Sequence, residues 1–121
     1  MKQVNIVAIS GNATRDGELS YTPSNMAILK FGVANNRSYK KGDEWVEETT
    51  FVDVVTFGSH AETMAKHVKK GMNVLVQGRV KEDRWESKEG QKRSKLNIVA
   101  DCVMAFPKLP KAAEADQDDP F

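Results

Sequence analysis

Residues 49–80 read TTFVDVVTFGSHAETMAKHVKKGMNVLVQGRV, and they indicate the fold most clearly because their periodicity changes twice. Residues 49–57 alternate with a period of two, which predicts a β-strand. Residues 60–70 place apolar side chains at spacings of three and four, which predicts a short helix with Ser59 as its N-cap. Residues 73–80 return to a period of two. One helix between two strands is therefore expected in the middle of the chain.

Alternation also predicts two strands before this stretch, in residues 4–10 and 27–33, and a last strand in residues 96–106. Residues 87–90, Ser-Lys-Glu-Gly, are a turn signal that predicts a hairpin. Three strands, one helix and two strands are the arrangement of the OB-fold, an all-β, five-stranded Greek-key barrel. A sandwich or a parallel βαβ fold fits less well, because one helix cannot cover both faces of a parallel sheet.

The composition is that of one ordinary globular domain: 121 residues, of which 40% are hydrophobic and 29% charged. No apolar run approaches the ~18 residues of a membrane span, and the first residues are too interrupted for a signal peptide. A single cysteine, Cys102, excludes an internal disulfide and favours the cytoplasm. Because Cys102 falls in the apolar alternation of the last strand, it is expected to be buried.

The composition changes near Phe106, which predicts a domain in residues 1–106 and a tail in residues 107–121. The domain has 16 lysines and arginines against 13 aspartates and glutamates, a net charge of +3, and the tail has 2 against 4, a net charge of −2. The tail is expected to be a flexible linker ending in an acidic tip. A basic domain with an acidic tail suggests a polyanionic partner and a separate role for the tail.

Signals for catalysis and for metal binding are weak. The chain has no G-x-S-x-G motif, and its glycines end or bend elements and do not form a phosphate loop. His60 and His67 are seven residues apart, too far for a joint metal pair, so both are expected to be solvated helix residues. We therefore expect no catalytic residue, no metal site and no cofactor.

The most informative feature is a set of aromatic residues that lie beside basic ones or share a strand face: Tyr39, Phe51, Phe57 and Trp85. Proteins that bind unpaired strands combine a cationic track with aromatic rings on which bases stack, each worth about 1–3 kcal/mol. Phe57 fits a core position equally well. Trp45, which has acidic neighbours, is expected to be a packing or loop residue. Together the four aromatics predict a stacking platform.

Eight short motifs follow one another along the chain. They are GNATRDGELSYTPS at 11–24, FVDVVTFG at 51–58, VKKG at 68–71, VQGRV at 76–80, Arg84-Trp85, EGQ at 89–91, VAD at 99–101 and DDPF at 118–121. In this combination and order they are highly specific, and the chain resembles the bacterial and bacteriophage single-stranded DNA-binding proteins over nearly its whole length. The resemblance implies an OB-fold homotetramer that wraps single-stranded DNA in replication, recombination and repair. It implies no enzymatic activity. It also implies a cytoplasmic localisation, either associated with the nucleoid or, for a phage protein, in the cytoplasm of the host.

The resemblance implies that bases stack on the same four aromatics, and that Lys70 and Arg84 contact phosphates. Asp53, Ser59 and Asp83 stand where relatives carry basic residues, so DNA affinity and its salt dependence are expected to be lower. Candidate replacements for the lost phosphate contacts are Lys2, Arg15, Lys30, Lys40, Lys41, Lys81 and Lys95. Tyr39 and Phe51 stand where relatives often have tryptophan, so their stacking is expected to be weaker.

The acidic tip resembles the family's protein-docking tip and consists of Asp116, Asp118, Asp119, Pro120 and Phe121. An aromatic ring beside carboxylates suits a pocket with an apolar floor and a basic rim, which implies that replication, recombination and repair proteins dock there. Asp119 departs from the pattern, because relatives often have an apolar residue before the proline.

Two other classes of function remain open from the residues alone. An RNA-binding OB domain would use the same stacking surface, and relative affinity for RNA and DNA distinguishes the two. An adaptor subunit could instead pack the face of Phe51 and Phe57 on a partner protein, in which case no nucleic acid would bind. An enzyme is the least favoured class.

Overall fold

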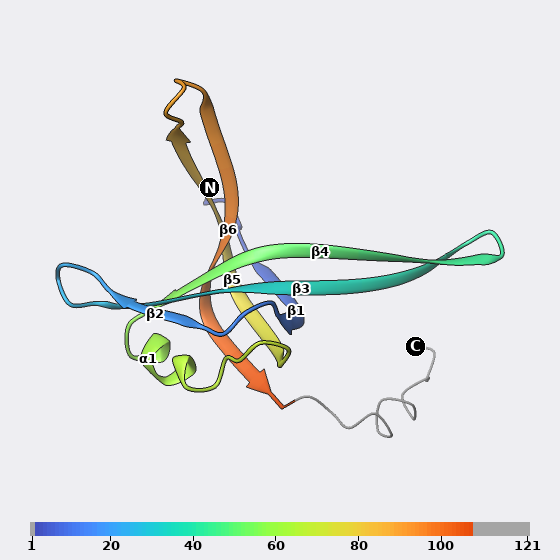
Figure 1. Cartoon of the computed structure of the whole chain (residues 1–121), viewed down its shortest axis with the longest axis horizontal. Helices are drawn as coiled ribbons and strands as arrows, with labels where there is room; N and C mark the ends of the chain where they lie inside the picture. Colours follow the sequence, from blue (N-terminus) through green and yellow to red (C-terminus); the bar gives the residue numbers. More distant parts are fainter. Residues whose placement is uncertain (1, 108–121) are drawn as a thin grey trace.

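The computed structural model of the chain describes residues 2–107, so the predicted linker beyond Pro107 and the tip lie outside the described residues. Figure 1 shows the order of the elements. They are β1 (Val7–Ala13), β2 (Glu18–Tyr21), β3 (Ala27–Lys41), β4 (Glu44–Phe57), α1 (Ser59–Ala65), β5 (Asn73–Glu86) and β6 (Lys92–Phe106).

Five strands close into a barrel in the order β1-β5-β6-β4-β3, and β3 pairs back with β1 at Ala34 and Asn12. All neighbours are antiparallel except β4 and β6, which run parallel from Asp53 and Asn97 onward. This is the predicted five-stranded OB-fold barrel with one short helix between its third and fourth strands. The sequence did not predict β2, a fully exposed strand that pairs only with β3 within the described residues.

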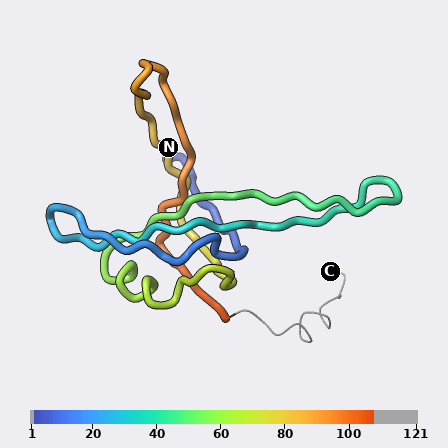
Figure 2. Tube along the Cα trace, in the orientation of Figure 1, coloured from blue at the N-terminus to red at the C-terminus, as the bar shows by residue number. Residues whose placement is uncertain are grey.

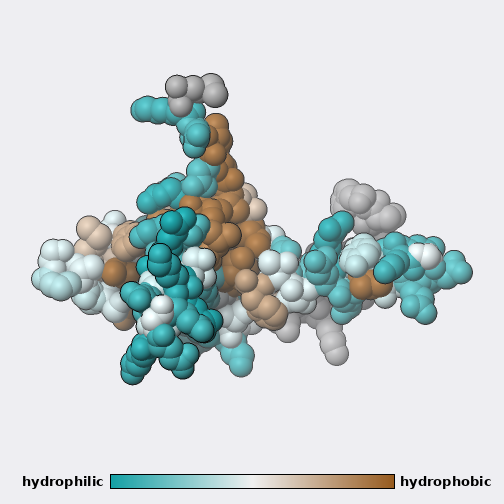
Figure 3. Space-filling model, turned by 90° about the horizontal axis from the view of Figure 1, so that it is seen from above, coloured by the Kyte–Doolittle hydropathy of each residue, from teal (hydrophilic) through white to brown (hydrophobic). Residues whose placement is uncertain are grey.

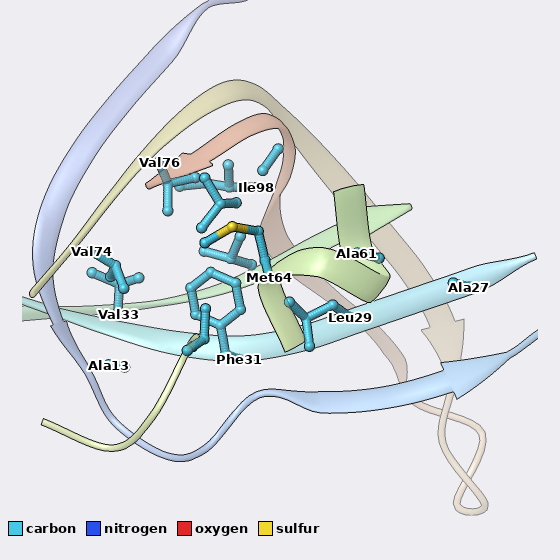
Figure 4. Close-up of a cluster of buried hydrophobic side chains, with 14 residues drawn as sticks. Ala13, Ala27, Leu29, Phe31, Val33, Ala61, Met64, Val74, Val76 and Ile98 are labelled. Atoms are coloured by element: carbon cyan, nitrogen blue, oxygen red, sulfur yellow. The ribbon is translucent and has the colours of Figure 1, made fainter. Parts of the chain in front are cut away.

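The barrel core is formed by the inward face of each strand and by α1 (Figure 4). Phe31, Leu29 and Val33 of β3 are completely buried, as are Val76 of β5 and Val68 after the helix. Alternation correctly predicted which side chains share a face in β3, β4 and β5, because a half-buried strand places every second side chain in the core. The core therefore leaves the opposite face of β4 available for other contacts.

Two long ribbons leave the barrel in different directions (Figures 1 and 2). The first is the distal half of β3 and β4, which remain paired as far as Lys41 and Glu44. The second is the distal half of β5 and β6, paired as far as Glu86 and Lys92. The sequence predicted a polar loop in the first region, because these strands have no core face there and therefore no apolar alternation.

The predicted helix is shorter than expected, and its predicted N-cap is wrong. The helix α1 ends at Ala65, five residues before the predicted Lys70, and Gly58 takes the N-cap position with φ +81° and no side-chain cap. Glycine suits that backbone conformation because it has no Cβ. After the helix, Val68 is buried and its carbonyl accepts a hydrogen bond from Gly17, so tertiary contacts replace further helical turns.

Cys102 is exposed, so the prediction that it is buried is wrong. The pairing of β5 with β6 shifts between Gln77 and Gly78, which leaves one extra residue on β6. A bulge of this kind reverses the alternation beyond it, and Val103 takes the inward position instead. Gly78 is required at this point, because a side chain there would overlap the carbonyl oxygen of Val99.

His60 is not the solvated helix residue that the sequence predicted. Its Nε2 atom accepts a hydrogen bond from the backbone amide of Val103 at 2.9 Å, which ties α1 to β6. No group of three potential metal ligands exists within residues 2–107. In the same range, no helix is long and apolar enough to cross a membrane.

Candidate nucleic-acid interface

The outward face of β4 carries two of the predicted stacking residues. Phe51 and Phe57 lie on the same side of the strand because they are six residues apart, and the core residue Val54 points the other way. Phe51 is 71% exposed and Phe57 is 42% exposed. The alternative that Phe57 belongs to the core is therefore wrong, and both rings are accessible to a ligand.

The third aromatic comes from the second ribbon. Lys81, Asp83 and Trp85 alternate along one face of β5, where they oppose Asn97, Lys95 and Arg93 of β6. Trp85 is 48% exposed, and its backbone belongs to the last pair but one of the ribbon. The ribbon therefore presents the indole on a β-strand, which positions a side chain more rigidly than a loop does.

A cleft of about 380 Å³ opens where the two ribbons diverge from the barrel. Residues from β3, β4, β5, β6 and the β1–β2 connection line it: Arg15, Ile28, Lys30, Asp53, Val54, Val55, Phe57, Lys81, Asp83, Lys95 and Asn97. Four of the predicted phosphate contacts meet there, although up to 80 residues separate them in the sequence. The cleft therefore places a cationic surface directly beside the ring of Phe57.

A second, shallower groove of about 440 Å³ follows the β5–β6 ribbon beside Trp85. Arg84 lies in it and forms an ion pair with Glu82, with 2.5 Å between Nε and Oε1. The hydrogen bond that Arg84 donates to Glu82, together with the negative charge of Glu82, raises the pKa of the Arg84 guanidinium above its ordinary value. Arg93 was not predicted, but it also lines this groove, opposite Trp85. The predicted hairpin contained a signal for it, because Arg93 lies three residues after the predicted turn at 87–90 and Trp85 lies two residues before it.

Tyr39 does not lie on the same face as Phe51, although the sequence predicted that both residues stack on bases. On β3 it has the same parity as the buried Phe31, so it lies on the opposite side of the pleat from Phe51. The guanidinium of Arg37 lies over its ring, 5.5 Å from the centroid, in a cation–π contact. A base that stacked on this ring face would have to displace Arg37.

Trp45 is neither a packing nor a loop residue, so its predicted role is wrong. It lies on β4 opposite Lys40, and it is 71% exposed. Its neighbours Asp43, Glu44 and Glu47 are acidic, which opposes the approach of a phosphate backbone. Trp45 lines neither of the two cavities.

The remaining predicted cations are spread over other parts of the surface. Lys40 and Lys41 are at the distal end of β3, and Lys2 precedes the first strand. Lys70 lies in the turn after α1, where its backbone amide donates a hydrogen bond to Asp16 at 2.8 Å. These four residues line neither the cleft nor the groove. Of the predicted phosphate contacts, Arg15, Lys30, Lys81 and Lys95 therefore lie together in the cleft, and Lys2, Lys40, Lys41 and Lys70 lie away from it.

Sequence comparisons match this chain to one family. The family described as the single-strand binding protein family matches residues 4–106. A single-stranded DNA-binding protein of Borreliella burgdorferi is 45% identical over 107 residues, which cover 88% of this chain and 72% of the relative. One of Treponema pallidum is 41% identical over 121 residues, which cover 100% of this chain and 68% of the relative.

Solved structures show the same fold. A deletion mutant of the single-stranded DNA binding protein from Thermus aquaticus superposes with a TM-score of 0.75 at 26% identity, over 85% of this chain and half of the Thermus chain. A Plasmodium falciparum protein solved in complex with single-stranded DNA gives a TM-score of 0.80 at 17% identity, over 88% of this chain and 97% of that one. The family match, the relatives and the shared barrel agree, and this chain belongs to the single-strand binding protein family.

Proposed function

We propose that this protein binds single-stranded DNA without sequence specificity and protects it in the cytoplasm during replication, recombination and repair. The observation that carries the proposal is a cationic cleft together with exposed aromatics on two strands, Phe51 and Phe57 on β4 and Trp85 on β5. Every base has a ring face, so stacking accepts any sequence, while Lys and Arg contact the phosphates. Binding of this kind requires neither a catalytic residue nor a cofactor.

Tryptophan fluorescence tests this proposal directly. Because the chain has two tryptophans, a Trp45→Phe variant leaves Trp85 as the only indole. We expect titration with oligo-dT to quench the fluorescence of this variant strongly, and higher salt to weaken the binding. RNA of the same length and duplex DNA should bind more weakly. Stronger binding to RNA would favour an RNA-binding domain, and no binding to any nucleic acid would favour an adaptor subunit.

We also propose that the chain assembles into a homotetramer. An apolar surface lies on the outside of β5, β6 and the segment before β1, and Figure 3 shows apolar side chains gathered on one side of the body. It includes Val4, Ile6, Leu75 and Met104, all exposed in this single chain, and Leu75 opposes Met104 across β5 and β6. Association of copies would remove this surface from water.

Replacing Ile6 with aspartate should therefore shift the protein toward smaller species, because a carboxylate would be buried in the interface without a partner. Light scattering coupled to size-exclusion chromatography measures the mass. Leu96→Asp is the matched control, because Leu96 is exposed on the β5–β6 ribbon away from this surface. A mass unchanged by Ile6→Asp, or lowered equally by both variants, would contradict the proposed interface.

The acidic tip is proposed to recruit replication, recombination and repair proteins. Deleting residues 116–121 removes Asp116, Asp118 and Asp119, anions that compete with the DNA phosphates for the cationic surface. We expect DNA binding by the truncated chain to be unchanged or tighter, and the recruitment of partner enzymes to be lost. Oligo-dT titrations and pull-downs from a bacterial lysate measure the two effects. A large loss of DNA affinity would contradict this separation of roles.

A further inference from the structure

The cationic cleft also contains two carboxylates, and each of them forms ion pairs within it. Asp53 pairs with Arg15 at 3.8 Å and with Lys95. Asp83 pairs with Lys81 at 3.7 Å. Three of the four cations that line the cleft therefore already face an anion of the protein itself.

The fold holds these charges together. The β1–β2 connection crosses β3 at Gly32, where the amide of Thr14 donates a hydrogen bond to the Gly32 carbonyl at 2.9 Å. Gly32 is also the cross-strand neighbour of Asp53, so this crossing brings Arg15 to Asp53. A side chain at position 32 would overlap the hydroxyl of Thr14, which explains the need for glycine there. The geometry therefore positions Arg15 over β4.

On the other side of the cleft, the register of β5 and β6 brings Asp83 and its neighbours together. Asp83 of β5 lies directly opposite Lys95 of β6, and Lys81 lies opposite Asn97. Asn97 donates a hydrogen bond to Asp83, which orients this carboxylate toward the cleft that both residues line. Asp53 contacts Lys95 where β4 and β6 begin to pair. The two carboxylates thus lie in one cleft, and each is held beside its own cations.

We propose that Asp53 and Asp83 act as internal competitors of the DNA phosphates, an inference that rests on the proposed function of the same cleft. In the free protein they neutralise Arg15, Lys81 and Lys95, and a bound strand must displace them to contact these cations. The paired side chains are 36% to 59% exposed. Exposed ion pairs are weak, so an incoming phosphate can replace the carboxylate. The two aspartates thereby set the affinity and its salt dependence.

Neutral variants of the aspartates test this inference. Each cation released for a phosphate contact steepens the salt dependence of log K by about 0.7, which is on the order of fivefold in affinity at 0.1 M salt. Asp83→Asn frees one cation and should show about this effect. Asp53→Asn frees two cations and should show up to about twice this slope change and up to about 25-fold tighter binding. Fluorescence titrations with oligo-dT at several salt concentrations measure both quantities.

A matched control separates this effect from the change in net charge. Glu62→Gln removes one negative charge from α1, outside the cleft, and should change affinity much less than Asp53→Asn. If the two variants bind alike while the unmodified protein binds oligo-dT well, the inference is wrong and the proposed function stands. If the unmodified protein does not bind oligo-dT, the proposed function itself fails.

A double-mutant cycle tests the specific pair of Asp53 and Arg15. In the unmodified protein, Arg15→Gln should weaken DNA binding by less than it does in the Asp53→Asn background, because a phosphate that contacts Arg15 must first replace its ion pair with Asp53. In the Asp53→Asn background the same change should weaken binding by about fivefold, because Arg15 then contacts a phosphate. Thermal unfolding of each variant checks that the fold is intact. Equal effects of Arg15→Gln in both backgrounds would overturn the assignment.

Discussion

Replacing Trp85 with alanine should weaken binding to oligo-dT by about 1–3 kcal/mol, which corresponds to a roughly 5- to 150-fold rise in the dissociation constant. The indole is about half exposed and lies on β5 along the same face as Lys81 and Asp83. A base that stacks on it would lie beside Lys81, one of the proposed phosphate contacts. Alanine removes the stacking surface but keeps the paired backbone of the ribbon. Fluorescence anisotropy of a labelled oligonucleotide measures the affinity without depending on tryptophan emission.

Trp45→Ala is the matched control for this experiment, because it makes the same substitution at the distal end of the other ribbon. Trp45 lines neither cavity and has acidic neighbours, so we expect a clearly smaller effect. Phe57→Ala should behave like Trp85→Ala, because Phe57 lines the cleft. Unchanged affinity in both Trp85→Ala and Phe57→Ala would show that the strand binds elsewhere on the protein.

Replacing Phe31 with alanine should lower the free energy of unfolding by about 3–5 kcal/mol, because it leaves a cavity in the barrel core. Phe31 is completely buried and belongs to the core cluster drawn in Figure 4. Domains of this kind are stable by only about 5–15 kcal/mol, so the variant should unfold at clearly lower urea concentration. Variants must be compared at one protein concentration, because assembly adds to apparent stability.

Phe51→Ala is the matched variant for Phe31→Ala, and we expect it to affect DNA binding and to leave stability nearly unchanged. The two phenylalanines are in neighbouring strands, but Phe51 points outward and is largely exposed. Its loss should change the free energy of unfolding by less than about 0.5 kcal/mol and weaken DNA binding by about 1–3 kcal/mol. Equal destabilisation by Phe31→Ala and Phe51→Ala would mean that Phe51 packs against the protein and is not available to a base.

Local periodicity was enough to predict which side chains share a face in β3, β4 and β5. The alternation around Val54 placed Phe51 and Phe57 on one face of the strand, opposite Val54, and the structure shows that this shared face is the outer one. The same reasoning failed at Cys102, because a bulge on the neighbouring pair shifts the alternation by one residue. A bulge depends on how two distant strands meet, as at Gly78 and Val99, and nothing in the sequence near Cys102 signals it.

The sequence also predicted the aromatic and cationic residue types of the interface, but not their grouping. Arg15, Asp53 and Lys95 are far apart in the chain, and only the crossing at Gly32 and the pairing of β4 with β6 bring them together. The β3–β4 ribbon was missed for a related reason: its strands have no core to face and therefore no hydrophobic alternation. The β5–β6 ribbon was predicted as a hairpin, because residues 87–90 carry a turn signal. Patterns of two and 3.6 residues record whether a side chain faces the core. Contacts between distant residues depend on strand register and barrel closure. These are set only when the whole domain folds, so a local pattern does not record them.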